Sequence, residues 1–196
     1  NNTSSGTYST ISGGYTNTAI GAYSTTVGGL QNTSNGQNST VGGGRLNKST
    51  CINSTVSGGY CNTSNCTSAT VSGGVCNTSS GIYSFVGSGY RNTSSGIYST
   101  IGGGSGNTAS NLYSVVGGGQ TNIASGVHSI VGGGKLNPTN CNYGTSLGGS
   151  GNTVNHEMSA TYGKDVISVS ACTFHVNYLA LQNTPEIDST NNNFLV

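Results

Sequence analysis

The chain has 196 residues, a formal net charge of +1 and only 5% charged residues, with 34 glycines and 32% hydrophobic residues. Low hydrophobicity without high net charge is not the usual composition of a disordered chain, and no apolar run reaches the ~18 residues that indicate a membrane span. No nucleic-acid partner is expected, because the five cations are scattered instead of forming a basic surface: Arg45, Lys48, Arg91, Lys135 and Lys164.

A 15-residue repeat runs from the first residues to about residue 155 without a change of phase. One glycine recurs in all ten repeats, and we call this set the Gly column: Gly14, Gly29, Gly44, Gly59, Gly74, Gly89, Gly104, Gly119, Gly134 and Gly149. One asparagine recurs in the same way, the Asn column: Asn17, Asn32, Asn47, Asn62, Asn77, Asn92, Asn107, Asn122, Asn137 and Asn152. A fixed short period of this kind indicates a stacked repeat architecture.

Each repeat predicts two short strands and two turns. In the repeat around residue 100, the segment 97–102 alternates β-branched, aromatic and small residues, and the segment 107–110 is the second strand. Tyr98 and Thr100 are expected on one face of the first strand. The opposite face is expected to hold Ile97, Ser99, Ile101 and Gly103. Glycine and asparagine supply the backbone angles that the turns require.

These units predict an all-β fold, a parallel β-solenoid of ten coils and about 50 Å in length. Each coil encloses only three or four small inward side chains, so the core of one chain is slight. We therefore expect several chains to associate side by side, and we predict a homotrimer, although composition alone does not give the number three. The glycine triplets, such as 102–104 and 117–119, are expected at one corner of successive coils.

The period is lost after residue 155, where the composition also changes. All four carboxylates of the chain lie beyond this point: Glu157, Asp165, Glu186 and Asp188. We predict a repeat domain at 1–155 and a β-rich collar at 156–196 that blunts the open end of the solenoid. The chain starts in mid-pattern and stops on an apolar run, so we expect it to be a segment of a longer polypeptide with a further C-terminal region.

The six cysteines suggest bonds between coils. Cys51 and Cys66 are 15 residues apart, and so are Cys61 and Cys76. Equivalent residues of adjacent coils lie about 4.8 Å apart, which suits the Cα separation of a disulfide. We predict the disulfides Cys51–Cys66 and Cys61–Cys76, with Cys61–Cys66 as the main rival pairing. Cys141 and Cys172 are left to pair with each other or with another chain, or to stay free. Disulfides imply an oxidising, extracellular location.

Ten Asn-x-Ser/Thr sequons occur, all within the first 92 residues. The best glycosylation candidates stand outside the Asn column: Asn38, Asn53 and Asn65. Further possible sites are Asn1, Asn2, Asn32, Asn47, Asn62, Asn77 and Asn92. Six of the latter belong to a column that stays asparagine where no sequon exists, as at Asn17, Asn107, Asn122, Asn137 and Asn152. The primary role of that column is therefore expected to be structural.

Several kinds of chemical site are disfavoured by the sequence. A phosphate loop needs Gly-Lys-Ser/Thr, but the one lysine after a glycine triplet, Lys135, precedes a leucine. No Asp or Glu occurs in residues 1–155, so acid–base catalysis and acidic Ca²⁺ turns are not expected there. No enzyme activity, cofactor or metal is predicted. His128 and His156 are expected to be surface or packing residues, and a trimer would bring three copies of His175 together as an axial ion site only as a minor alternative.

The repeat units "GIYSTIGGGSGNTAS" and "GVHSIVGGGKLNPTN" resemble the head repeats of YadA-like trimeric autotransporter adhesins and the β-roll segments of phage and algal-virus fibre proteins. The resemblance covers residues 1–155. It implies a left-handed parallel β-roll that forms a trimer about a fibre axis on an attachment appendage. The tail "FHVNYLALQNTPEIDSTNNNFLV" is similar to junctions before a C-terminal trimerisation or self-cleaving chaperone domain.

The sequence leaves three functions in competition. The favoured one is a structural and adhesive segment of an extracellular or virion-surface fibre, which contacts itself and host-surface carbohydrate. An ice-binding solenoid is the first alternative, because one column is mainly threonine: Thr10, Thr25, Thr40, Thr55, Thr70 and Thr100. A polysaccharide-processing solenoid enzyme is the second, and it would have to use Glu157 or Asp165.

Overall fold

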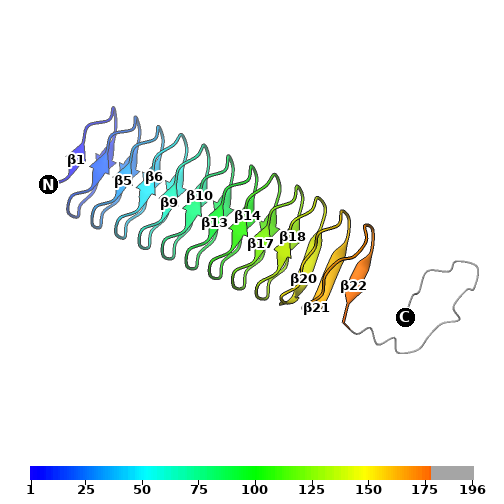
Figure 1. Cartoon of the computed structure of the whole chain (residues 1–196). Helices are drawn as coiled ribbons and strands as arrows, with labels where there is room; N and C mark the ends of the chain where they lie inside the picture. Colours follow the sequence, from blue (N-terminus) through cyan, green and yellow to red (C-terminus); the bar gives the residue numbers. More distant parts are fainter. Residues whose placement is uncertain (178–196) are drawn as a thin grey trace, which may run out of the picture.

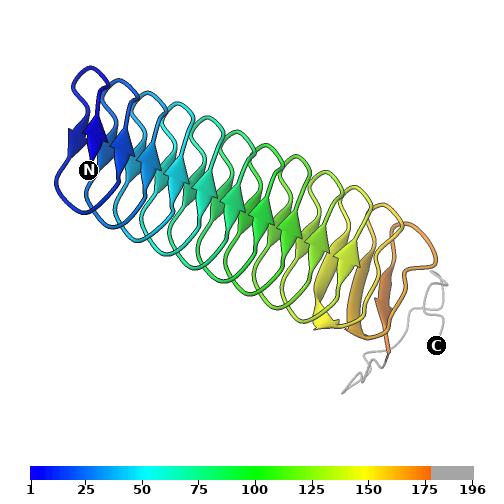
Figure 2. The same cartoon turned by 60° about the vertical axis from the view of Figure 1, so that its left-hand side comes forward.

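The computed structural model describes residues 1–177, which form an all-β parallel solenoid of about twelve coils and contain no helix. The coils stack into a rod, with the N-terminal coil at one end and β22 (Phe174–Val176) in the last described coil at the other (Figure 1). Each coil passes through one strand of each of two sheets, and successive strands lie in line along the rod (Figure 2). The predicted fold class is confirmed.

The first sheet has ten strands, each formed by the two residues that follow the Asn column. In order along the rod, they are β1 (Thr3–Ser4), β3 (Thr18–Ala19), β5 (Thr33–Ser34), β7 (Lys48–Ser49), β9 (Thr63–Ser64), β11 (Thr78–Ser79), β13 (Thr93–Ser94), β15 (Thr108–Ala109), β17 (Ile123–Ala124) and β19 (Pro138–Thr139).

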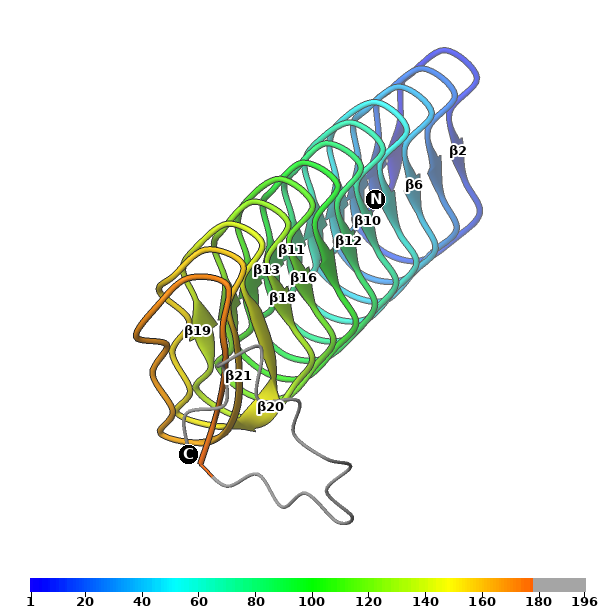
Figure 3. The same cartoon turned by 90° about the vertical axis from the view of Figure 1, so that its right-hand side faces the viewer.

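The second sheet has twelve strands and lies on the other side of the coil (Figure 3). In order, they are β2 (Thr10–Ile11), β4 (Thr25–Thr26), β6 (Thr40–Val41), β8 (Thr55–Val56), β10 (Thr70–Val71), β12 (Phe85–Val86), β14 (Thr100–Ile101), β16 (Val115–Val116), β18 (Ile130–Val131), β20 (Thr145–Ser150), β21 (Ala160–Lys164) and β22.

The strands pair in parallel with an offset that equals the sequence repeat. Thr3 pairs with Thr18 in the first sheet, and Thr10 pairs with Thr25 in the second. A third ladder of single bridges starts at the residue after the Gly column, where Tyr15 pairs with Leu30, and continues to Lys135 and Ser150. Three ladders in the same register turn each column of the sequence into a column of stacked residues in space.

The core is a thin layer between the two sheets. The second sheet contributes one inward β-branched residue per coil, such as Val86 or Ile101, and the first contributes Ser or Ala. Inward hydroxyls pair across the layer, as between the Oγ atoms of Ser94 and Ser99 at 2.7 Å. Full burial of one valine or isoleucine stabilises the fold by about 1.5–3 kcal/mol. Each coil therefore depends on its neighbours, which cover it above and below.

One part of the predicted strand pattern is wrong. Ser99 and Ile101 point into the core as expected, but the Ile97 side chain is 43% exposed. The reason is the length of the strand: β14 contains only Thr100 and Ile101, so the inward–outward alternation does not extend back to residue 97. Ile97 lies in the turn that precedes the strand.

The number of coils also differs from the predicted ten. Residues 156–177 continue the solenoid, because β21 pairs in parallel with β20 and β22 pairs with β21. The repeat there shortens to 14 residues: a register shift lies between Ser146 and Gly148, so that Ser146 pairs with Thr161 but Gly148 pairs with Tyr162. Of the residues assigned to the collar, 178–196 lie outside the described part of the chain, including Glu186 and Asp188.

Candidate functional site

The Asn column forms a continuous hydrogen-bonded ladder inside the rod. The Asn107 N–H donates to Oδ1 of Asn92 at 2.9 Å, and the Asn107 Oδ1 accepts the N–H of Asn122 at 2.9 Å. The Asn107 Nδ2 donates to the carbonyl oxygens of Gly103 at 2.9 Å and Gly119 at 3.0 Å. All ten members are fully buried. Each side chain thereby joins three coils and satisfies backbone groups that the tight corner leaves without a strand partner.

This burial separates the sequons into two groups. A glycan would replace a hydrogen of Nδ2, which in the column donates two buried hydrogen bonds. Glycosylation is therefore incompatible with the folded coil at Asn32, Asn47, Asn62, Asn77 and Asn92. The asparagines of the remaining sequons are exposed: Asn1, Asn2, Asn38, Asn53 and Asn65. Use of these five sites stays a prediction.

The Gly column turns the chain next to the Asn ladder. Gly104 has a φ of +90°, a left-handed backbone angle that residues with a side chain rarely adopt. A Cβ built on Gly104 would overlap the carbonyl oxygen of Gly119 in the next coil. The same conflict recurs at every member of the column, so the last glycine of each triplet is required by the chain's own fold.

The aromatic residues of the repeat form an exposed corner of stacked rings, which we call the Tyr column. Tyr83, Tyr98, Tyr113, His128 and Tyr143 stack one on another, with ring centroids 4.8–5.2 Å apart. All five have φ near +55°, which costs roughly 1–2 kcal/mol per residue. Ring stacking, at about 0.5–1.5 kcal/mol per pair, offsets part of that cost.

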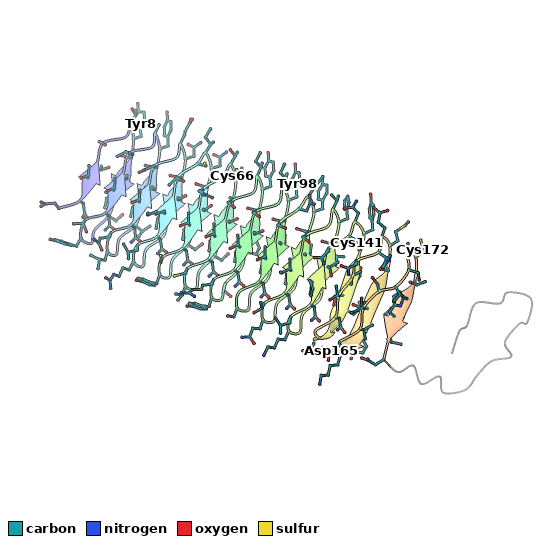
Figure 4. All side chains as sticks on the ribbon, in the orientation of Figure 1. Tyr8, Cys66, Tyr98, Cys141, Asp165 and Cys172 are labelled. Atoms are coloured by element: carbon teal, nitrogen blue, oxygen red, sulfur yellow. The ribbon has the colours of Figure 1, made fainter. Side chains whose placement is uncertain are left out.

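The Tyr column and three of the cysteines share one edge of the rod. Figure 4 shows Tyr8 and Tyr98 pointing outward along the edge that also carries Cys66, Cys141 and Cys172. Asn38 and Asn53 take the place of tyrosine in this column, and the Asn38 Nδ2 donates to the Asn53 Oδ1 at 3.1 Å. These two best glycosylation candidates therefore lie at an exposed corner, between the stacked pair Tyr8 and Tyr23 and the longer stack that starts at Tyr83.

The disulfides predicted from the spacing are not present: among residues 1–177, no two sulfur atoms lie at bonding distance. Cys51–Cys66 and Cys61–Cys76 do occupy equivalent positions of adjacent coils. Residues in register on parallel coils carry parallel side chains, however, so their Cβ atoms stay about 4.8 Å apart, whereas a disulfide needs about 3.5–4.5 Å. The rival pair Cys61–Cys66 is separated by β9, which places the two thiols at different corners.

Cys141 and Cys172 differ strongly in their surroundings. Cys141 is buried and its Sγ donates to the carbonyl oxygen of His156 at 2.9 Å, whereas Cys172 is exposed. Burial raises the pKa of the Cys141 thiol above its ordinary value, and the Glu157 carboxylate adds to this increase. At any pH below that pKa, less of Cys141 is present as the reactive thiolate.

We expect iodoacetamide to alkylate Cys141 at least tenfold more slowly than Cys172 at pH 8, and the rate at Cys141 to keep rising at higher pH. Peptide mass spectrometry over a time course measures both rates in one sample. The same sample in denaturant is the control, because unfolding removes the burial of Cys141. Equal rates in the folded protein would contradict the described environment of Cys141.

Threonines line one outward column on each sheet. On the first sheet the column is interrupted by Lys48, Ile123 and Pro138, and on the second by Phe85, Val115 and Ile130. Inward residues of the two sheets bond to each other, as Thr26 does with Ser34 at 2.9 Å, so the outward columns point away from each other. Each sheet therefore offers one interrupted threonine column, and not the flat double row that ice binding would favour.

The described residues do not assemble a catalytic or metal cluster. No group of three or more His, Cys, Asp or Glu side chains comes together within residues 1–177. Glu157 accepts a hydrogen bond from Asn142 at 3.2 Å, and the Nδ1 of His156 lies 3.2 Å from the Oγ of Ser168. His175 bonds to Thr173. Over the same residues, no helix is long and apolar enough to cross a membrane.

No protein-family model matches the chain, and no curated protein matches its sequence.

Proposed function

We propose that the chain is a structural and adhesive segment of an extracellular or virion-surface fibre, in which it assembles with copies of itself as a homotrimer. The solenoid is a rod built by repetition, with flat sheets and an almost uncharged repeat region, so copies pack side by side without electrostatic repulsion. The number three follows from the resemblance to trimeric adhesin heads.

The observation that carries this proposal is the middle glycine of each triplet. This open glycine column comprises Gly13, Gly28, Gly43, Gly58, Gly73, Gly103, Gly118, Gly133 and Gly148, with Ser88 in the tenth coil. At seven of the nine, an added Cβ meets no heavy atom of the described chain within 4 Å. Only Gly43 and Gly148, with φ of +153° and +155°, have a backbone angle that favours glycine.

The fold of one chain therefore does not explain why glycine recurs at this position. The close approach of another chain does explain it, because glycine is used where another backbone comes near. The column borders the outward face of the second sheet, where Phe85 is 37% and Ile130 is 45% exposed. We assign this face, with the open glycine column, as the contact between copies.

The adhesive role is assigned to the opposite corner, where the Tyr column exposes ring edges and hydroxyls in a regular row. Tyrosine offers an apolar body and a polar tip, a combination that suits contact with carbohydrate. Replacement of Tyr98 and Tyr113 by serine is the probe of this role. Loss of cell-surface or glycan binding with assembly retained supports it, and unchanged binding opposes it.

Valine at Gly118 and Gly133 is expected to separate the trimer into folded monomers. The two side chains enter open space in the monomer, but overpacking at a tight contact costs about 1–3 kcal/mol per site, or roughly tenfold in affinity at each. Mass measurement by light scattering gives the number of chains, and circular dichroism checks the fold.

The matched control is Gly118→Ser with Gly133→Ser, since Ser88 already occupies this column, and it should remain trimeric. A trimer that withstands both valines would move the interface to another face. A monomeric native chain at all concentrations would refute the trimer itself.

A further inference from the structure

Cys61 and Cys76 form a stacked pair of thiols at the corner that follows the third ladder. Both have a left-handed backbone, with φ of +57° and +56°, and they follow Tyr60 and Val75, which are paired in that ladder. Their backbones are held in the same way, since the Cys61 N–H donates to the Arg45 carbonyl and the Cys76 N–H donates to the Tyr60 carbonyl, both at 2.9 Å. The two side chains therefore leave adjacent coils in parallel.

The surroundings of the pair favour negative charge on sulfur more than those of the other cysteines. Arg91 is the next residue of the same column, and its charge lowers the pKa of the Cys76 thiol, although burial and the adjacent Cys61 thiol outweigh it and leave that pKa raised. Arg91 is itself positioned with its guanidinium carbon 4.9 Å from the centre of the Tyr90 ring. No carboxylate is available nearby, because residues 1–155 contain none.

The spacing of the pair suits a bridging atom better than a direct bond. The coils are separated by about 4.8 Å, which is wide for the Cβ atoms of a disulfide. Two metal–sulfur bonds of about 2.3 Å each, placed end to end, span about 4.6 Å. Soft cations such as Cu(I) prefer thiolate ligands. A single soft cation therefore fits between two sulfurs that the ladder already holds in parallel.

The other stacked pair provides an internal comparison. Cys51 and Cys66 have the same spacing of 15 residues, but the Cys51 Sγ donates to the carbonyl oxygen of Asn65 at 2.9 Å. That thiol is directed to the backbone of the next coil and not to its partner cysteine. Neighbouring positions of that corner carry no arginine.

We propose that Cys61 and Cys76 form a two-coordinate site for a soft monovalent metal ion of the Cu(I) type. Binding joins one Cu⁺ to the two sulfurs and releases the two thiol protons to solvent, which leaves a bis-thiolate complex with one negative charge beside Arg91. No electron is transferred in this step. The site is independent of whether the rod is an adhesive fibre.

The test is an anaerobic titration of the reduced, full-length protein with Cu(I) in competition with a chromophoric Cu(I) chelator. Native protein is expected to bind one more tight equivalent than Cys61→Ser or Cys76→Ser. Loss of one of two tethered ligands should weaken that equivalent by about a hundredfold or more. Cys51→Ser is the matched control and should bind as the native protein does, while circular dichroism confirms that all variants keep the fold.

Two further readouts distinguish the site from general thiol binding. X-ray absorption should show two sulfur ligands on the tight ion, and about two protons should be released per ion. The proposal is overturned if Cys61→Ser and Cys76→Ser bind like the native protein, or if Cys51→Ser loses the same equivalent. It is also overturned if protein purified without reductant contains a Cys61–Cys76 disulfide, because no thiolate pair then remains.

Discussion

Alanine at Gly119 should destabilise the rod by about 3 kcal/mol or more, whereas alanine one residue earlier, at Gly118, should change its stability by less than about 0.5 kcal/mol. Gly119 has a φ of +86°, and a Cβ there would overlap the carbonyl oxygen of Gly134. At Gly118 the Cβ meets no heavy atom of the described chain within 4 Å. The overlap involves backbone, so a change of side-chain conformation cannot relieve it.

Urea unfolding of the two variants, followed by circular dichroism, measures the difference. Because each coil is stabilised by its neighbours, the effect of Gly119→Ala should include faster hydrogen exchange in the adjacent coils. Equal stabilities for the two variants would contradict the assignment of the last glycine of the triplet to the fold. The pair is well matched, since both changes add one methyl group to the same corner.

The second large effect is expected at the Asn ladder. Replacement of Asn107 by alanine removes both donors to the Gly103 and Gly119 carbonyls and leaves the buried Asn122 N–H without its acceptor. A buried polar group without a partner costs about 1–3 kcal/mol, so the total loss should reach about 3–5 kcal/mol. Asn107→Asp should be worse, because its carboxylate would face two carbonyl oxygens in a buried position.

Asn140 is the control for this prediction. It is exposed, and its Nδ2 donates to the Asn155 Oδ1 at 2.9 Å, so Asn140→Ala removes one solvent-accessible hydrogen bond. The expected loss is below about 0.5 kcal/mol. Thermal and urea unfolding of the three variants give the comparison. An Asn107→Ala protein as stable as Asn140→Ala would show that the ladder contributes little to stability.

The candidate surface could be predicted only in part. The position of the Tyr column at an exposed corner follows from Asn38 and Asn53, which replace tyrosine with a polar residue. The two glycine columns could not be distinguished, because glycine in sequence does not reveal which atoms a Cβ would meet. The disulfides failed for a related reason: the spacing of 15 gives the distance between coils, but not the direction of the thiols within them.

The sequence by itself determined the repeat, the two strands of each coil and the parallel register, because a strict period of 15 allows equivalent residues to stack only in phase. It also marked the Asn column as structural, since asparagine persists there without a sequon. Only the tertiary structure decided where the solenoid continues beyond residue 155, because the register shift near Leu147 absorbs a one-residue loss that hides the phase. It alone also showed which side chains are buried, since burial depends on the adjacent coils and on the opposite sheet.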